Sequence, residues 1–381
     1  MICALAVSLA LLRVKTIQPQ RLRTLTPGGA CILVERVPTS KFVTVQLFAA
    51  AKGAPETAET NGQRHLLEHL VAPGDGTIDQ AIETRGGYLF AKTMRDAMVF
   101  EIEIPTSDLP FALDCLRKIA RKRAFTDSDI AKESKIIGEE GALRESSSEL
   151  SQSAWLKSYG DRGGDPFGDL DVISRSTPTE MNTLQAATFR QSNLCLVISG
   201  DVDLDKATAS GSQFLGSMPE FSLPNAVERK AGIGGPVSSR VRGVVLAVPV
   251  EGFRHPATSA TLAAALVLAS GIPTGFMTYT PSAGPGMVLF GSKQGTSLTK
   301  LAREAVAEEL FASAKLIARR WVNRQLEDTS LNASFRGLLL VQENDLKPET
   351  MLENIDAMTL EEFRAALASF TSDQAVLVVG R

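Results

Sequence analysis

Two of the three histidines in the chain stand four residues apart, in the sequence Arg64-His-Leu-Leu-Glu-His69. On an α-helix, residues i and i+4 lie one above the other on the same face, so the imidazoles of His65 and His69 could bind one metal ion. Glu68 would lie at the edge of that face, where its carboxylate could take a proton from a water molecule activated by the metal. The order H-x-x-E-H therefore predicts a zinc site with Glu68 as the general base.

A catalytic zinc site needs a further protein ligand and an open position for water. The candidates Glu133 and Glu140 are seven residues apart in a stretch expected to be helical, so they share a face. Ile136 and Ile137 lie near that face, which indicates that it points inward. An inward carboxylate is costly unless it is paired or bound to a metal. We therefore expect one glutamate to be a ligand and the other its supporting partner.

Each part of this pattern also has an ordinary explanation. Two histidines on a helix can belong to a solvated surface, and neighbouring glutamates such as Glu139 and Glu140 usually do. The combination argues against both explanations, because an H-x-x-E-H sequence is followed by a pair of inward glutamates roughly 70 residues later. We interpret the two motifs as parts of one site.

The elements expected around these residues are those of an α+β protein. Runs of β-branched and aromatic residues predict strands, and helical periodicity predicts helices that begin and end at capping residues. The strands are expected at 30–36, 42–49, 88–93, 97–104 and 195–199, and the helices at 62–71, 77–85, 107–121 and 126–148. Long helices and strands without strict alternation favour an α+β layer over a doubly wound parallel sheet.

The chain of 381 residues is long for one core, which favours two globular domains. Residues 218–239 are rich in Pro, Gly and Ser and predict a linker between a domain over 21–217 and another over 240–381. Both domains end in a Thr-capped helix, 179–189 or 359–370, followed by a strand that ends in Gly. This repeat predicts two homologous sandwich domains, each a mixed or antiparallel sheet covered by long helices, with the second copy shortened.

Composition excludes several kinds of partner. Hydrophobic residues make up 44% of the chain and charged residues 22%, and the net charge is −3, so neither nucleic acid nor an anionic membrane surface is an expected partner. After residue 20 no apolar stretch approaches the roughly 20 residues of a membrane span. The apolar residues within 1–20 are expected to be a secretory signal, which would favour an exported or periplasmic protein, or a short N-terminal extension, which leaves a cytoplasmic location open.

Further features of the first half join the two motifs into a larger pattern. The strand FVTVQLFAAAKG precedes HLLEHL, and Gly86-Gly87, Ala91-x-Thr93-x-x-Asp96 and Glu133-x6-Glu140 follow. With these features the chain resembles the insulinase/pitrilysin metallopeptidases, in particular their compact bacterial and mitochondrial-processing-peptidase branch. The resemblance implies an inverted zincin in which His65, His69 and Glu140 bind Zn²⁺, Glu68 is the catalytic base and Glu133 supports the site.

The resemblance also implies a reaction and a substrate. The reaction would be zinc-dependent endopeptidase hydrolysis of peptides or unfolded protein segments, enclosed between the two homologous halves. Two residues are candidates for substrate binding. Phe90 stands where the family usually has an Asn that helps to hold extended peptide near the metal, and Tyr279, in TGFMTYTPSAG, resembles an element that positions substrate. Packing in a core or loop is the alternative for Tyr279.

Two rival functions follow from the same resemblance. One is a non-catalytic scaffold, like the core subunits of respiratory complexes that share this fold. The other is a catalytic subunit that needs a partner, as a homodimer or as a heterodimer with a related subunit. The complete set of zinc ligands favours an enzyme over a scaffold. The shortened second half, which lacks a clear Arg before the element at Tyr279, favours dependence on a partner.

Overall fold

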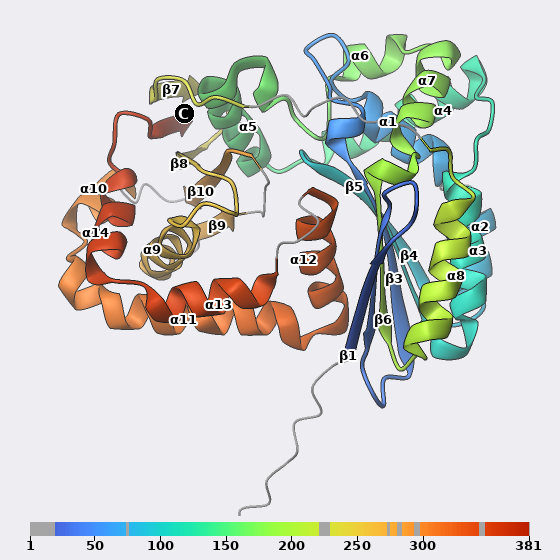
Figure 1. Cartoon of the computed structure of the whole chain (residues 1–381). Helices are drawn as coiled ribbons and strands as arrows, with labels where there is room; N and C mark the ends of the chain where they lie inside the picture. Colours follow the sequence, from blue (N-terminus) through green and yellow to red (C-terminus); the bar gives the residue numbers. More distant parts are fainter. Residues whose placement is uncertain are drawn as a thin grey trace, which may run out of the picture.

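The computed structural model describes residues 20–73, 76–220, 229–272, 275–279, 284–292, 298–342 and 347–380. Within them the chain forms two α+β halves side by side, each built on one sheet (Figure 1). The residues expected as a signal or extension lie outside the described part, apart from Gln20 at the start of the first strand. In the described residues no helix is both long and apolar enough to cross a membrane.

The first half contains a sheet with the strand order β1-β2-β6-β3-β5-β4. Its strands are β1 Gln20–Leu25, β2 Cys31–Arg36, β3 Phe42–Ala50, β4 Tyr88–Thr93, β5 Ala97–Pro105 and β6 Leu194–Gly200. Its helices are α1 Gln63–Val71, α2 Thr77–Glu83, α3 Leu109–Ala120, α4 Asp127–Ala142, α5 Ser146–Tyr159, α6 Leu170–Arg175, α7 Pro178–Thr188 and α8 Leu204–Gly216.

The second half contains a sheet with the strand order β7-β11-β8-β10-β9. Its strands are β7 Gly235–Ser239, β8 Gly243–Val250, β9 Gly275–Tyr279, β10 Gly286–Ser292 and β11 Val376–Gly380. Its helices are α9 Thr258–Ser270, α10 Leu298–Glu304, α11 Ala307–Glu327, α12 Thr329–Gln342, α13 Pro348–Ala357 and α14 Leu360–Ser369.

The second sheet repeats the pairing of the first without its edge strand β1. In the first sheet, β6 runs parallel to β2 and antiparallel to β3. In the second, β11 runs parallel to β7 and antiparallel to β8. The helix before each of these strands starts with a capping box, at Thr177 with Glu180 and at Thr359 with Glu362. The expected duplication with a shortened second copy is confirmed, although the cap of the first helix is Thr177 and not Thr179.

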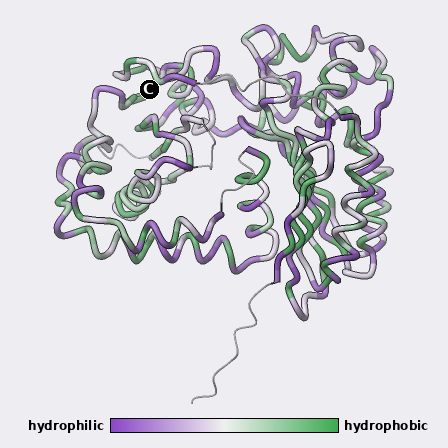
Figure 2. Tube along the Cα trace, in the orientation of Figure 1, coloured by the Kyte–Doolittle hydropathy of each residue, from purple (hydrophilic) through white to green (hydrophobic). Residues whose placement is uncertain are grey.

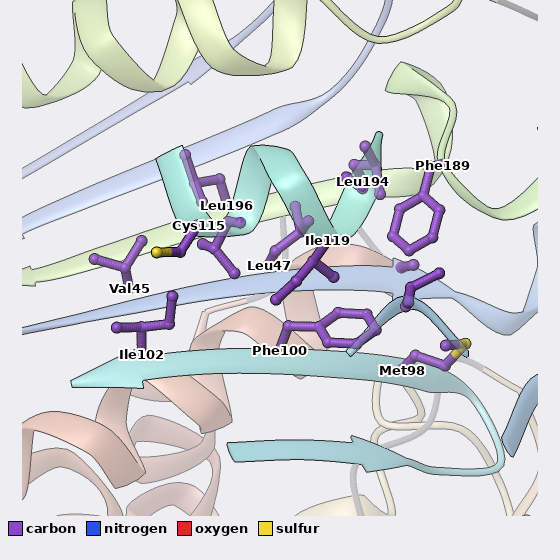
Figure 3. Packing of buried hydrophobic residues seen from close by; sticks show 14 of the residues in the cluster. Val45, Leu47, Met98, Phe100, Ile102, Cys115, Ile119, Phe189, Leu194 and Leu196 are labelled. Atoms are coloured by element: carbon purple, nitrogen blue, oxygen red, sulfur yellow. The ribbon is translucent and has the colours of Figure 1, made fainter. Parts of the chain in front are cut away.

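One face of the first sheet forms the main core. Because successive side chains of a strand point to opposite faces, Leu47 and Phe100 project to the side covered by α3. There they meet Cys115 and Ile119 of that helix (Figure 3). Figure 2 shows hydrophobic residues along the strands of this sheet, and also along α9 at the centre of the second half, a helix that is buried on nearly all sides.

The other face of each sheet is covered by a helix from the opposite half. Helix α12, from the second half, packs on the first sheet, where Ala333 and Leu340 contact Phe48 and its neighbours. Helix α5, from the first half, packs on the second sheet through Trp155 and Tyr159. The two halves are therefore joined by an exchange of helices, visible in Figure 1 as α5 beside β8 and α12 beside the first sheet.

Two expected boundaries differ from the structure. The helix expected over 126–148 is two helices, because α4 ends at Ala142 and α5 starts at Ser146, which lets the chain cross to the second sheet. Within the segment expected as a linker, residues 235–239 form strand β7, which pairs with β11. Residues 221–228 lie outside the described part, so the domain boundaries at 217 and 240 stay predictions.

Candidate metal site

Helix α1 carries the H-x-x-E-H residues, and its first turn is fixed by Gly62 and Glu56. Gly62 has φ of 107°, a conformation that favours glycine, and directs the chain into the helix. The carboxylate of Glu56 accepts hydrogen bonds of 2.9 Å from the main-chain N–H groups of Gly62 and Arg64. A negative charge at a helix N-terminus satisfies free N–H groups and the helix dipole. The position of His65, one residue later, is set by this turn.

His65, His69 and Glu140 bring their ligand atoms together. Nε2 of each histidine lies 3.7 Å from Oε2 of Glu140, and one ligand atom from each of the three side chains lies within 4.8 Å of the others. Glu140 comes from α4, which contacts α1. No other group of three such side chains that could hold a metal occurs in the described residues. Two helices thus supply the three predicted ligands.

Each histidine is oriented through its other ring nitrogen. Nδ1 of His65 lies 2.9 Å from the carbonyl oxygen of Phe167, which can only accept a hydrogen bond, so Nδ1 carries the proton. Nδ1 of His69 lies 3.5 Å from Oε2 of Glu133, a buried oxygen that has no hydrogen-bond partner in the described structure. The lone pair of each Nε2 is then free to point toward Glu140. Metal-binding histidines typically donate the N–H of their other ring nitrogen to a carbonyl or carboxylate in this way.

This donor set fits a zinc ion. When both imidazoles are neutral and carry their proton on Nδ1, the two Nε2 lone pairs face the carboxylate oxygen of Glu140 with no proton between them. Such an arrangement is repulsive unless a cation lies among the three atoms. Two imidazoles and one carboxylate are a ligand set that zinc uses in catalytic sites. Glu140 is 48% exposed, so the site is open on the side where water would enter.

Glu68 lies beside this cluster but outside it. Its carboxylate is buried and accepts a 2.5 Å hydrogen bond from the hydroxyl of Thr93, at the end of β4. Burial raises the pKa of Glu68, while the hydrogen bond from Thr93 acts in the opposite direction. A carboxyl group with a raised pKa is suited to accept and then return a proton near neutral pH.

The two candidate substrate-binding residues lie apart from each other. Phe90, 48% exposed, is on edge strand β4, on the sheet face that looks toward the second half. Tyr279 is only 7% exposed and packs against Phe253 in the core of the second half. The structure does not bring Tyr279 to the cluster, because alternation along β9 turns it to the face of the second sheet that α9 covers. Its neighbour Thr278 instead lines a cavity shared with Thr93.

Sequence reasoning missed two contributors to the site. Thr93 belongs to a segment that carried the resemblance, but no role follows from that. Alternation along β4 is the signal that could have found it, since Leu89, Ala91 and Thr93 share the inward face. The carbonyl of Phe167 has no such signal, because every residue has a carbonyl and only the fold determines which one meets His65.

Part of the chain that includes these residues is similar to a known protein family. Residues 31–158, from β2 to the end of α5, match the insulinase family, peptidase family M16. The chain contains an insulinase-family domain. This domain includes His65, Glu68, His69, Glu133 and Glu140, so all five residues predicted to form the metal site and its base lie inside the matched segment.

Two relatives extend the match of the insulinase-family domain to about half of the chain. An uncharacterized zinc protease of Mycobacterium leprae is 26% identical over 218 residues, which cover 55% of this chain and 49% of that protein. Mitochondrial-processing peptidase subunit beta of Saccharomyces cerevisiae is 27% identical over 207 residues, 52% of this chain and 45% of the subunit. The chain thus spans about half the length of the relatives that it matches.

Solved structures match the fold over nearly the whole chain. A protease from Helicobacter pylori superimposes with a TM-score of 0.83 at 18% identity, covering 95% of this chain and 99% of that one. An inactive M16 peptidase domain from Pseudomonas fluorescens gives a TM-score of 0.74 at 16% identity, with the same coverage. The same fold thus occurs in a protein named a protease and in a domain named inactive, so function must be argued from the site.

Proposed function

We propose that the protein is a zinc-dependent endopeptidase that hydrolyses peptides or unfolded protein segments. The observation that carries this proposal is the meeting of His65, His69 and Glu140, whose ligand atoms lie within 4.8 Å of one another. These three residues would hold the zinc, and Glu133 would orient His69. The names of the relatives support the metal and the reaction, since several of them are zinc proteases.

Glu68 supplies the proton transfers of the proposed reaction. Zinc, when bound, lowers the pKa of water and polarises a carbonyl group. The Glu68 carboxylate accepts a proton as water attacks the peptide carbonyl, and it then donates this proton to the leaving amine. The hydroxyl of Thr93 holds one carboxylate oxygen in place, which leaves the other free for the transfers. No covalent bond between the enzyme and the substrate is needed.

A peptide substrate could bind in extended form along strand β4. This strand is one of the two edge strands of the first sheet, and a peptide could pair with its outer main-chain groups. Because β4 ends at Thr93, a peptide on this edge would pass Glu68. A cavity of about 210 Å³ adjoins Thr93 where the two halves meet, and it could accept an apolar side chain, since Trp155, Met287 and Leu338 line it.

A partner-dependent catalytic subunit is the second candidate. Two observations favour it: Tyr279 lies in a core away from the site, and the relative from Saccharomyces cerevisiae is one subunit of a processing peptidase. In this case the protein would bind zinc but need a second copy of itself or a related subunit to hold the substrate. A purely scaffolding role is the third candidate, because one of the structural matches is an M16 domain named inactive.

One experiment separates these functions. Zinc content and cleavage of a quenched pool of unstructured peptides are measured on the same preparation, alone and after mixing with candidate related subunits. About one zinc per chain with cleavage supports the endopeptidase, and cleavage only after mixing supports the partner-dependent subunit. In His65→Ala, two remaining ligands should not retain the metal against buffer. Full zinc content in His65→Ala would contradict the proposed site.

A further inference from the structure

The orientation of His65 depends on a loop that lies far from it in the sequence. Its Nδ1 is held by the carbonyl oxygen of Phe167, 102 residues later. Residues 164–169, which carry this carbonyl, contain neither helix nor strand. A main-chain carbonyl has no side-chain torsions of its own, so its position is that of the loop. The contacts that fix the loop therefore determine where Nε2 of His65 points.

Asp165 makes three of these contacts. One carboxylate oxygen accepts a hydrogen bond of 3.1 Å from the main-chain N–H of Phe167. The other binds Arg144 at 2.7 Å, and the main-chain carbonyl accepts a 2.8 Å hydrogen bond from the side chain of Asn61. The side chains of Arg144 and Asp165 are 24% and 15% exposed, so water screens their ion pair less than it would at the open surface.

Arg144 connects this loop to the helix of the carboxylate ligand. It follows Glu140 by four residues, in the turn that ends α4. Its guanidinium lies 4.5 Å from the centre of the Phe167 ring, and that ring lies 5.1 Å from the ring of His65. The rings of His65 and His69 are 4.9 Å apart. A continuous series of contacts thus leads from the end of α4 to both histidines.

The main chains of the loop and of α1 also touch. Gly168, with φ of 96°, lies against Gly62, and a side chain on Gly168 would overlap the main chain of Gly62. The N–H of Asp169 donates to the carbonyl of Asn61 at 3.1 Å. With such close packing, a displacement of the loop cannot be absorbed locally and would be passed to the first turn of α1.

We propose that Arg144 and Asp165 are positioning residues of the metal site. Neither would contact the metal; their ion pair sets the position of the Phe167 carbonyl relative to Glu140, and through it the geometry of His65. This inference rests on the proposed zinc site. According to this inference, the contacts of the loop at residues 164–169 contribute part of the affinity for the metal.

The test measures zinc affinity in Arg144→Gln and Asp165→Asn by competition with a chromophoric chelator. Asp165→Asn keeps the size of the side chain, whereas Arg144→Gln shortens it and keeps a polar end; both changes remove the ion pair. Loss of a residue that orients a metal ligand typically lowers affinity about 10- to 100-fold, and we expect this for both. The double variant should bind zinc no more weakly than either single variant, because all three break the same link. The absorption bands of bound Co²⁺ should shift, since they report the ligand geometry.

Arg85→Gln is the matched control. Arg85 binds Asp108 at 2.7 Å and lies 4.1 Å from the centre of the Phe111 ring, so it repeats the contacts of Arg144 in the same half without involving the cluster. The metal-free variants should melt at similar temperatures, whereas only Arg144→Gln should lose zinc affinity. Equal zinc affinity in Arg144→Gln and Arg85→Gln would overturn the proposal while leaving the zinc site intact. A wild-type protein that binds no zinc would overturn the proposed function as well.

Discussion

The hydroxyl of Thr93, at the end of an edge strand, donates a 2.5 Å hydrogen bond to the carboxylate of Glu68 in helix α1. This hydrogen bond links strand β4 of the first sheet to helix α1 at the proposed general base. Because Glu68 is outside the ligand set, its loss should affect proton transfer and leave the metal in place.

Glu68→Gln is therefore expected to keep its zinc and its melting temperature close to wild type. Peptide hydrolysis should fall by at least about 10²-fold, the lower end of what a positioned general base contributes. Zinc stoichiometry, thermal melting and cleavage of a quenched peptide pool would be measured on one preparation. If Glu68→Gln cleaves as fast as the wild type, the proposed mechanism is wrong.

The two glutamates of α4 should respond differently to the same substitution. Glu140→Gln removes a ligand and should release the zinc, whereas Glu133→Gln removes only the partner of His69 and should weaken affinity or activity by about 10- to 100-fold. Metal analysis after dialysis compares the two. If Glu133→Gln loses the metal and Glu140→Gln keeps it, the assigned roles are reversed.

A glycine-to-alanine change should have opposite effects in two helices. Around Gly138 in α4 there is open space for a methyl group, so Gly138→Ala should raise the free energy of unfolding by about 0.5–1 kcal/mol. A methyl group on Gly337 in α12 would overlap the buried ring of Phe48, so Gly337→Ala should lower it by about 1–3 kcal/mol. Urea unfolding measures both. A stabilised Gly337→Ala would mean that α12 does not pack on the first sheet as described.

The pH dependence of stability should reveal the ion pairs of Glu349, which lies in α13 and binds Arg21 and Arg336. Partial burial acts to raise the pKa of Glu349, but its hydrogen bonds and the charges of the two arginines outweigh burial and hold the pKa below 4.5. The unfolded chain therefore binds the proton at higher pH than the folded protein. The stabilisation is fully present above pH 4.5 and is lost as the pH falls through the lowered value.

Glu349→Gln should accordingly be less stable than the wild type by about 1 kcal/mol at pH 7, a small value because this side chain is 40% exposed. The difference should shrink toward zero in acid. Glu353→Gln, an exposed change of the same charge one turn later in α13, is the control and should show little difference at any pH. A gap for Glu349→Gln that is constant from pH 7 to acid would contradict the assignment of the effect to ionised Glu349.

Local patterns in the sequence predicted much of this structure. The spacing of His65 and His69 depends only on helix geometry, so it predicted the centre of the candidate site, and the seven-residue spacing of Glu133 and Glu140 predicted the second helix, whose Glu140 lies close to both histidines. The repeated helix and strand at the end of each half follow equally from local caps. All of these features are determined by residues that lie close together in the sequence.

The remaining features depend on contacts between distant segments. Tyr279 stands in a motif-like stretch, yet the face on which it lies is set by the pairing of β9 with β10. The packing of α12 on the first sheet follows from no local pattern, since an amphipathic helix does not indicate which sheet it will cover. The sequence therefore predicts which elements carry the chemistry better than it predicts how those elements meet.

The exchange of α5 and α12 limits how the molecule can admit a substrate. If the two halves moved apart by a hinge motion, each sheet would lose the helix that covers one of its faces. Apolar residues such as Phe48 and Trp155 would then be exposed to water. In the proposed peptidase, a substrate would therefore enter through an opening that exists without such a movement. Because only Leu143, Arg144 and Glu145 separate α4 from α5, any strain on the second half also pulls on the helix that bears Glu140.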